Sequence, residues 1–234
     1  MKYMGSKNRI AKYILPIMLT GRKPDQYWVE PFVGGANMID KVTGNRIGAD
    51  LNEYVIALLK KMSKEEFSAP MINKDTYKMI KNDKEQFEKW VVGYAGTQLS
   101  FGSTWFGSYR RDNKGIRNYC LEAQNNVNKQ AGSLKSVIFT SCSYQDLVIP
   151  PNSIIYCDPP YDTEATKGKY KDSFEHKDFW QWCRDKEVEG HKVFISEYNA
   201  PKDFKCIYQK EITQRMNNNA DTKKGIERLF EYCG

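Results

Sequence analysis

Apolar and polar positions along the chain follow two spacings, one typical of strands and the other of helices. Short runs rich in β-branched and aromatic residues predict buried strands at residues 27–33, 46–50, 136–140, 153–157 and 191–196. Apolar residues three or four positions apart predict helices near residues 10–18, 55–59, 84–92, 119–129 and 179–183. Residues 206–213 and 227–232 predict a closing antiparallel pair, with the polar residues 217–224 as its loop. The whole pattern predicts an α/β fold with a mixed sheet.

The first predicted helix and the middle of the chain depart from this regular pattern. Pro16 interrupts the first helix, so we expect a bend or an early end there. After residue 60 strands and helices stop alternating, and residues 96–111 interleave glycines, hydroxyls, aromatics and arginines without core periodicity. We therefore predict a catalytic domain made of residues 1–59 and 134–234. Residues 60–133 then form an inserted subdomain of helices and loops.

The net charge of +7 is concentrated in the middle third of the chain. Residues 60–135 hold 14 Lys and Arg against 8 Asp and Glu, whereas the rest of the chain is close to neutral. A basic region of this kind favours a polyanion as the partner, and a merely solvated basic face is the alternative. Aromatics in such a region can stack on unpaired bases. The alternative for Trp105 and Phe106 is that they anchor a packed surface loop.

Length and composition exclude several classes of protein. At 234 residues the chain fits one large domain or one domain with an insertion. No apolar run approaches the ~20 residues that cross a bilayer, and the first residues lack the apolar core of an export signal. Six cysteines without a C-x-x-C pair, and two histidines, predict free thiols in a reducing cytoplasm and no metal site.

A stiff acidic corner follows the predicted strand at residues 153–157. Asp158 is followed by Pro159 and Pro160, which offer no backbone N–H and force an extended conformation, and then by Tyr161. In open α/β sheets, ligands bind at the carboxyl ends of the strands. The corner is therefore a candidate ligand site, and the alternative is an ordinary proline turn with a tyrosine packed over it.

A glycine turn and a second acid form another candidate site. Gly34 and Gly35 follow the first strand where a helix is expected to begin, so the backbone there can approach another molecule closely. Asp50 ends the second strand, 16 residues after Gly34. An acid in this place accepts hydrogen bonds from ribose hydroxyls in doubly wound folds, and the alternative is that Asp50 caps the next helix. The fingerprint G-x-G-x-x-G is absent, which disfavours a nicotinamide-dependent dehydrogenase.

The motifs, taken in order, resemble those of Dam-type DNA adenine methyltransferases. The matching residues are Tyr3, Gly5, Ser6 and Lys7, then Glu30-Pro31-Phe32-Val33-Gly34-Gly35-Ala36, then Ala49-Asp50-Leu51-Asn52, and then Asp158-Pro159-Pro160-Tyr161. The tail residues Thr222, Lys223, Lys224, Glu227 and Leu229 resemble the closing hairpin of the family. The match covers roughly residues 1–60 and 134–234. It implies a Rossmann-like S-adenosylmethionine (SAM)-dependent methyltransferase fold, with a mixed sheet and a C-terminal antiparallel hairpin.

The chain departs from the family pattern in two places. Ala36 stands where relatives often carry a third glycine, which we expect to be tolerated. The insertion lacks the long Asn-Val-Pro-Phe recognition hairpin of the GATC-methylating members. The segments Ser100-Phe101 and Trp105-Phe106-Gly107 nevertheless resemble the loop that the family places against DNA. The resemblance therefore supports the chemistry more strongly than any particular DNA sequence.

The resemblance implies a site-specific enzyme that transfers a methyl group from SAM to N6 of an adenine flipped out of duplex DNA. The catalytic residues it implies are Asp158, Pro159, Pro160 and Tyr161. Those implied to bind SAM are Tyr3, Lys7, Glu30, Phe32, Gly34, Gly35, Asp50 and Asp158. Those implied to bind DNA are Trp105, Tyr109, Arg110, Arg111, Lys114 and Arg117. Asp158 and the carbonyl of Pro159 would accept the hydrogens of the amine, and Tyr161 would stack on the flipped base.

Several alternatives stay open at this point. The same chemistry could act on cytosine N4, on an RNA adenine or on a glutamine side chain, and a DNA-binding relative could have lost catalysis. We expect a monomer that binds double-stranded DNA, neither a metal nor a membrane, in a bacterial or bacteriophage-infected cytoplasm. The sequence leaves open whether the enzyme belongs to a restriction–modification system. Residues 162–171 are expected to form a lid or loop over the site.

Overall fold

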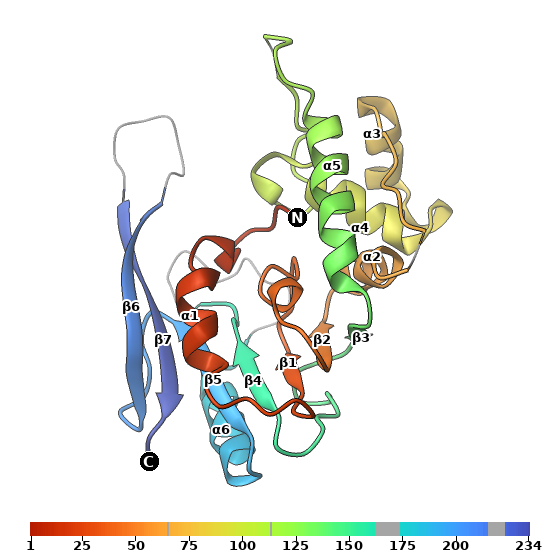
Figure 1. Cartoon of the computed structure of the whole chain (residues 1–234). Coiled ribbons are helices and arrows are strands. Elements are labelled where there is room, and N and C mark those ends of the chain that lie inside the picture. Colours follow the sequence, from red (N-terminus) through yellow and green to blue (C-terminus); the bar gives the residue numbers. More distant parts are fainter. Residues whose placement is uncertain (65, 113, 162–173, 215–222) are drawn as a thin grey trace. The chain divides into compact units, whose positions relative to one another are not determined.

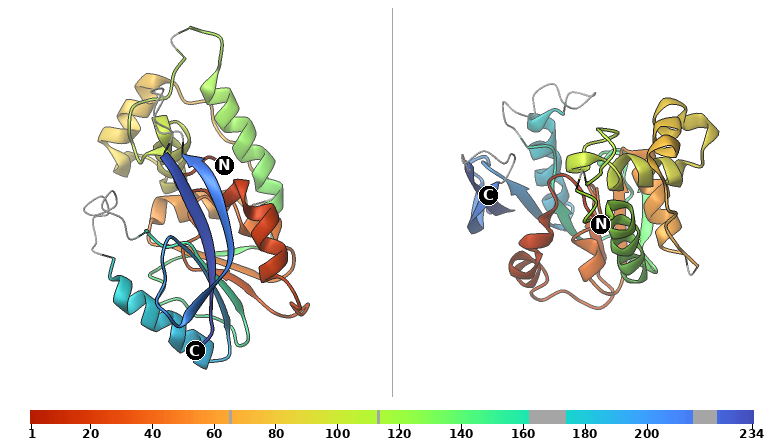
Figure 2. Two further views of the ribbon diagram at one scale, coloured as in Figure 1. Left: turned by 90° about the vertical axis from the view of Figure 1, so that its left-hand side faces the viewer. Right: turned by 90° about the horizontal axis from the view of Figure 1, so that it is seen from above.

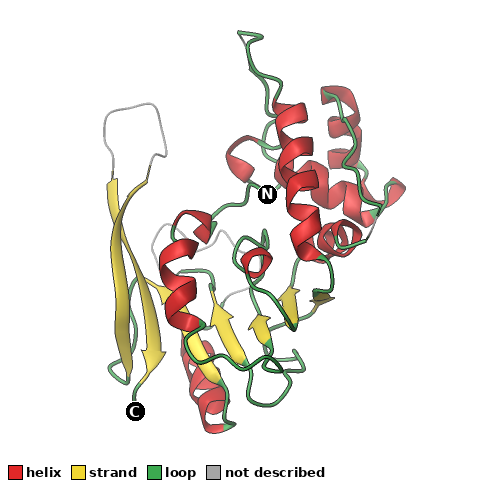
Figure 3. Ribbon diagram, in the orientation of Figure 1, coloured by secondary structure: helices red, strands yellow, loops and turns green. Residues whose placement is uncertain are grey.

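The computed structural model describes residues 1–64, 66–112, 114–161, 174–214 and 223–234 (Figure 1). These residues divide into two compact units. Unit 1 comprises residues 1–12 and 31–147, and unit 2 comprises residues 13–30 and 148–234. The described elements are mainly helical in unit 1 and mainly strands in unit 2, as the red and yellow ribbons of Figure 3 show.

Unit 1 combines two parallel strands with a group of helices. The strands are β2 (Arg46–Asp50) and β3 (Ile138–Ser141), which pair in parallel with Gly48 opposite Phe139. The helices are α2 (Glu53–Met62), α3 (Lys74–Asn82), α4 (Lys89–Gln98) and α5 (Tyr119–Ala131). Short 3₁₀ turns complete the unit at η1 (Lys7–Arg9), η2 (Ile39–Lys41), η3 (Lys84–Gln86), η4 (Phe101–Ser103) and η5 (Gly132–Leu134).

Helices α2 and α4 approach each other closely because of a glycine. A Cβ added at Gly93, in the middle of α4, would collide with the backbone carbonyl of Tyr54 in α2. Gly93 therefore allows the two helices to pack backbone against backbone at this point, although glycine lowers helix propensity. Residues 92–98 of α4 are all buried, so packing stabilises a helix that its own sequence favours only weakly.

Unit 2 contains a five-stranded mixed sheet. In the order β1-β4-β5-β7-β6, the first three strands pair in parallel, and β7 pairs antiparallel with both of its neighbours, β5 and β6. The strands are β1 (Trp28–Glu30), β4 (Ile154–Cys157), β5 (Lys192–Glu197), β6 (Phe204–Gln214) and β7 (Lys223–Tyr232). The long strands β6 and β7 lie side by side in both views of Figure 2. The unit also contains α6 (His176–Val188) and most of α1 (Ala11–Met18).

Strands β1 and β4 of unit 2 are buried, and β5 is buried except at Lys192. All four residues of β4 are buried, and large side chains of the core come from several elements of the unit: Trp28, Tyr156, Phe179 and Phe194. Two buried polar groups of this core find partners there. The indole N–H of Trp28 donates to Glu30 Oε1 over 2.7 Å, and the hydroxyls of Tyr156 and Ser196 lie 2.8 Å apart. Buried, fully bonded polar groups keep the strands in one register.

The predicted fold class is confirmed. The parallel strands and the antiparallel C-terminal pair form the mixed α/β arrangement that the sequence predicted. The predicted division of the chain at residues 59 and 134 stays a prediction. The described residues of the 60–133 segment belong to the same compact unit as the glycine turn.

Two local expectations were wrong. The glycine turn is followed by the 3₁₀ turn η2, so no α-helix begins there. The helix predicted at residues 84–92 starts at Lys89 and runs on to Gln98, because buried packing rather than propensity decides its extent. Helix α3 was not predicted. Pro16 lies inside α1, which ends two residues later at Met18. The predicted lid at residues 162–171, and residues 217–222 of the predicted loop, lie outside the described residues.

Candidate active site

The glycine turn of unit 1 is tightly bent and lies directly against Tyr3. Gly34 has a φ of +44° and Ala36 a φ of +53°. A Cβ at Gly34 would lie 2.7 Å from Tyr3 Cε1, and a Cβ at Gly35 would lie 2.5 Å from Tyr3 Cβ. Glycine is therefore required at both positions for Tyr3 to pack on the backbone. The structure thus brings together two of the predicted sequence motifs, the N-terminal one and the turn.

Asp50 is bonded to the backbone of this turn. Its Oδ2 accepts the N–H of Gly34 over 3.0 Å, and its Oδ1 accepts the N–H of Asn52 over 2.9 Å. Burial raises the pKa of Asp50 above its ordinary value, and the two backbone hydrogen bonds oppose that rise. An ionised carboxylate has about four acceptor positions, so two stay available for a ligand. The alternative role of Asp50 as a helix cap is wrong, because Asn52 caps α2.

Phe32 and Lys7 are two further candidate residues of unit 1. Phe32 is half-buried, and its ring centroid lies 5.4 Å from that of Tyr144. Lys7 is buried and donates from Nζ to the carbonyl of Gly5 over 3.1 Å. Tyr144 was missed by the sequence analysis because a lone tyrosine after a strand gives no local signal.

The acidic corner of unit 2 follows the buried strand β4. Asp158 and Tyr161 are half-buried and Pro159 is buried. The Tyr161 hydroxyl donates to Glu227 Oε2 over 2.9 Å. Its ring meets that of Tyr198 edge to face, at a centroid distance of 4.7 Å. These contacts fix the plane of the Tyr161 ring from strand β7 and from the loop after β5.

The electrostatics of the corner keep Tyr161 protonated. Burial raises the pKa of Tyr161 well above its usual value, and the nearby carboxylates of Asp158 and Glu227 raise it further. The hydroxyl therefore stays a hydrogen-bond donor to Glu227 at neutral pH. Glu227 belongs to the tail that resembles the family's closing hairpin, but no role was predicted for it. Tyr198 was not predicted as a site residue.

Glu30 ends β1 in unit 2, and one of its carboxylate oxygens bonds a core side chain. It is buried, and its Oε1 accepts the indole N–H of Trp28. Asp158 and Glu30 both raise the pKa of the neighbouring Tyr156 hydroxyl, after the larger effect of burial. Glu30 and Asp158 therefore place carboxylates at the carboxyl ends of β1 and β4.

The predicted DNA-binding residues differ in how firmly they are held. Arg110 and Arg117 lie over the ring of Tyr119, at 4.0 and 4.8 Å from its centroid. Arg117 also donates to both carboxylate oxygens of Glu122, over 2.8 and 3.0 Å. Arg111 and Lys114 are exposed. Arg110 and Arg117 are thus oriented by their neighbours, whereas Arg111 and Lys114 extend into solvent.

Aromatic residues of the same region have structural contacts. The Tyr109 hydroxyl donates to the carbonyl of Ile72 over 2.9 Å, so its polar end is engaged inside the unit. Trp105 packs edge to face on Phe106 at 5.0 Å and also lies 5.7 Å from Tyr54, between ring centroids. Trp105 is still 39% exposed, which leaves part of its ring open to a stacking partner.

No helix in the described ranges is both long and apolar enough to cross a membrane.

The model of one protein family matches the chain over residues 3–96 and 99–223. That family is the D12 class of N6 adenine-specific DNA methyltransferases. The matched ranges include the glycine turn, Asp50, the acidic corner and most of the basic insertion. Because the match extends over nearly the whole sequence, the chain belongs to the D12 class of N6 adenine-specific DNA methyltransferases, as its ordered motifs predicted.

Proposed function

We propose that this protein uses SAM to methylate N6 of an adenine that is flipped out of duplex DNA. The observation that carries the proposal is the corner Asp158–Tyr161, where a half-buried carboxylate and an oriented aromatic ring follow a buried strand. An exocyclic amine needs hydrogen-bond acceptors and its base needs a stacking surface. The corner offers both kinds of group within four residues.

The glycine turn and Asp50 are suited to the nucleoside part of SAM. The half-buried Asp50 carboxylate uses two acceptor positions on backbone N–H groups and keeps two for ribose hydroxyls. Tyr3 supplies an aromatic ring that lies against the turn, and Phe32 supplies a second ring two residues before Gly34 in the sequence. When bound, SAM supplies a methyl group on a sulfonium, and the carbon–sulfur bond breaks as the nitrogen–carbon bond forms.

Asp158 and the carbonyl of Pro159 would accept the two hydrogens of the adenine amine. The lone pair of that amine is delocalised into the ring, and hydrogen bonds to both hydrogens favour a pyramidal nitrogen whose lone pair is available. Positive charge develops on the nitrogen during transfer, so the charged acceptor Asp158 bonds most strongly in the transition state. Asp158 then takes the released proton and passes it to solvent.

Tyr161 would hold the flipped base by stacking. Flipping costs a few kcal/mol of lost pairing and stacking in the duplex, and a base–aromatic contact recovers about 1–3 kcal/mol. A ring fixed in advance by Glu227 and Tyr198 loses little freedom on binding. The hydroxyl is bonded to Glu227, so the face of the ring rather than its polar end is the part offered to the base.

The insertion would bind the duplex. Arg110, Arg111, Lys114 and Arg117 form a basic cluster that suits phosphate contacts, which position DNA without specifying its sequence. The exposed part of Trp105 suits stacking against a base that has left the duplex. Binding should therefore weaken steeply as salt concentration rises, since each phosphate contact releases counterions.

The direct test is to identify the methylated product. Purified protein is incubated with isotopically labelled SAM and, separately, duplex DNA or RNA, and the digested nucleosides are analysed by mass spectrometry. We expect labelled N6-methyladenine from DNA only. Labelled N4-methylcytosine, or label in RNA alone, would assign the chemistry to another amine. Binding of DNA with no transfer at all would indicate a relative that has lost catalysis.

A further inference from the structure

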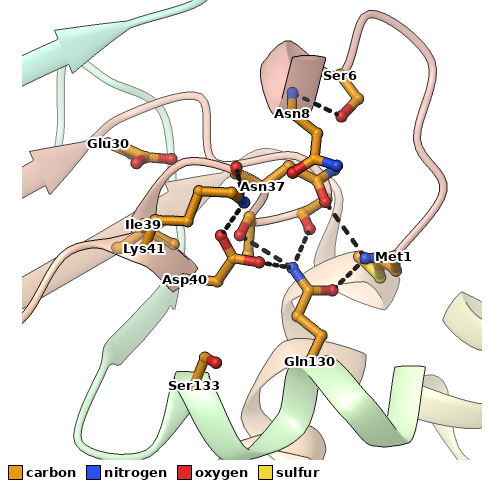
Figure 4. Close-up of polar contacts among 12 residues, drawn as sticks. Met1, Ser6, Asn8, Glu30, Asn37, Ile39, Asp40, Lys41, Gln130 and Ser133 are labelled. Carbon is orange, nitrogen blue, oxygen red and sulfur yellow. Dashed lines mark hydrogen bonds and ion pairs between the residues drawn. The ribbon is translucent and has the colours of Figure 1, made fainter. Parts of the chain in front are cut away.

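The last turn of α5 reaches the carbonyl side of the glycine turn through one side chain. Gln130 is buried, with 6% of its surface exposed. Its Nε2 lies 3.1 Å from the carbonyl oxygen of Gly35 and 3.0 Å from that of Ala36. It also lies 2.9 Å from Asp40 Oδ2. Figure 4 shows these contacts converging on a single amide nitrogen, whose two hydrogens are shared among the three acceptors.

This turn needs external support because it contains a residue other than glycine in a left-handed conformation. Ala36 has a φ of +53°, which an L-residue with a Cβ adopts only at an energetic cost. Its N–H donates to Val33 over 2.8 Å, which closes the turn from inside. The carbonyls of Gly35 and Ala36 point the other way, and Gln130 is the side chain that bonds both. Without it, the buried carbonyl of Gly35 would lose this donor, and that of Ala36 would keep the N–H of Asp40 at 3.3 Å. The strained conformation would thereby lose a restraint.

Gln130 is itself fixed on its remaining polar atom. Its Oε1 accepts a hydrogen bond from the nitrogen of Met1, which also donates to Asn37 Oδ1 over 3.3 Å. Asp40 in turn accepts from Lys41 Nζ, at 2.7 Å between Oδ1 and Nζ. The amide therefore has a single orientation, with its donor side facing the turn (Figure 4).

The opposite side of the turn carries the groups that we assign to the cofactor. Gly34 donates its N–H to Asp50, and Tyr3 packs on Gly34 and Gly35. A shift of the turn would therefore move two things together: the N–H of Gly34, which bonds Asp50, and the backbone on which Tyr3 packs. Gln130 contacts neither Asp50 nor Tyr3 in these bonds, so any effect on them passes through the backbone of the turn.

We propose that Gln130 is a positioning residue for SAM: it holds the strained glycine turn in the conformation that orients Asp50 and Tyr3. The inference rests on the proposed function, in which that turn and Asp50 bind SAM. It predicts an effect on affinity for SAM rather than on the transfer step, because Gln130 acts on the binding turn and not on the reacting amine.

The test compares two substitutions on the same helix. Gln130→Met keeps the length of the side chain and removes its amide. Gln124→Met is the matched control, because Gln124 is half-buried on α5 and donates from Nε2 to Ala69 over 2.6 Å, away from the turn. Binding of SAM is measured by calorimetry, methyl transfer by steady-state kinetics, and folding by thermal melting of each variant.

We expect Gln130→Met to raise the Kd and KM for SAM about tenfold, the size of effect typical of one lost hydrogen-bonded contact. At saturating SAM, kcat should stay within about threefold of wild type, since uniform binding is lost and transition-state contacts are kept. Gln124→Met should change neither constant by more than about twofold. Equal effects of the two substitutions, or a loss of kcat without a change in KM, would overturn the inference.

A second change tests the role of strain. Ala36→Gly removes the Cβ that disfavours positive φ, so in the Gln130→Met background it should recover part of the lost affinity for SAM. If Gln130→Met fails to fold, Gln130→Asn keeps an amide that is too short to reach both carbonyls, and it should weaken SAM binding while melting cooperatively. Absence of recovery by Ala36→Gly, together with wild-type affinity in Gln130→Asn, would count against positioning. A wild-type protein that does not bind SAM would instead overturn the proposed function itself.

Discussion

The two candidate sites, the glycine turn of unit 1 and the acidic corner of unit 2, are held in place by different kinds of interaction. In unit 1 the glycine turn is held by hydrogen bonds from distant side chains, with Asp50 on one side and Gln130 on the other. In unit 2 the corner owes its shape to two prolines after a fully buried strand. Its aromatic end, Tyr161, is also held by distant partners.

This difference suits the tasks that we propose for the two regions. A turn held by several separate hydrogen bonds can lose one of them and still bind its ligand more weakly. A reacting amine needs acceptors in fixed places, and a corner stiffened by its own covalent structure provides them without adjustment. Changes in unit 1 should therefore produce graded losses of affinity, whereas changes at the corner should stop the chemistry.

The largest effect is expected for the corner carboxylate. Asp158→Asn removes the charge that stabilises the developing positive nitrogen, so the transfer rate should fall by about 10³-fold. Transfer of labelled methyl groups to DNA measures the rate, and melting and DNA binding should be unchanged. Asp178→Asn, an exposed acid on α6 in the same unit, serves as the control. A rate within tenfold of wild type would remove Asp158 from the catalytic role.

The second effect separates the ring of Tyr161 from its hydroxyl. Tyr161→Ala removes the stacking face and should lower kcat/KM for DNA about 100-fold, the upper range for one base–aromatic contact. Tyr161→Phe keeps the ring and loses the hydroxyl with its bond to Glu227, so it should stay within about tenfold of wild type. Fluorescence of a base analogue at the target position reports base flipping. Equal losses in the two variants would show that the hydroxyl, rather than the ring, is what matters.

A smaller and more graded effect is expected for Asp50. Asp50→Asn keeps the shape of the side chain and removes its charge, so the Kd for SAM should rise about tenfold with little change in kcat at saturation. Asp75→Asn, an exposed acid at the start of α3, is the control in the same unit.

The pH dependence of SAM binding sharpens this prediction. The ionised carboxylate of Asp50 is the form that accepts hydroxyl groups, and burial raises its pKa above the ordinary 3.8. In the wild type, affinity should therefore decrease on acidification from a higher pH than an ordinary aspartate would give. Titrations at several pH values should show that the Asp50→Asn variant lacks this component. An identical pH profile in both proteins would contradict the assignment.

The smallest effect concerns stability rather than chemistry. Burial lowers the pKa of His191 below its ordinary 6.5, with Lys186 acting in the same direction and Glu189 opposing. Its Nδ1 accepts the N–H of Ser153 over 3.1 Å, which requires the neutral ring. Below pH 6.5 the unfolded chain binds the proton more readily than the folded one, so the free energy of unfolding should decrease as pH falls.

Denaturant unfolding at several pH values checks this expectation. His191→Asn can still accept from Ser153 and does not titrate, so its unfolding free energy should vary less between pH 7 and pH 5. The transfer rate per folded molecule should be the same in both proteins, because His191 lies immediately before β5 and outside the corner Asp158–Tyr161.

The sequence by itself determined the local chemistry of the protein. Short buried strands, the prolines after Asp158 and the paired glycines at residues 34 and 35 are encoded by neighbouring residues, because backbone sterics act over a few positions. The ordered motifs were enough to predict the family and the α/β fold class. Helices of the insertion were predicted less well, since α4 contains Gly93 and Gly96 and is stabilised by burial rather than by propensity.

Only the tertiary structure decided which side chains support these motifs. Tyr161 and Glu227 are 66 residues apart in the chain, and Gln130 and Gly35 are 95 apart. Such pairs leave no pattern in a single sequence, because either residue alone suits many surroundings. The left-handed conformation of Ala36 was hidden for the same reason: its sequence allows the turn, but the hydrogen bonds of Asp50 and Gln130 across unit 1 hold it.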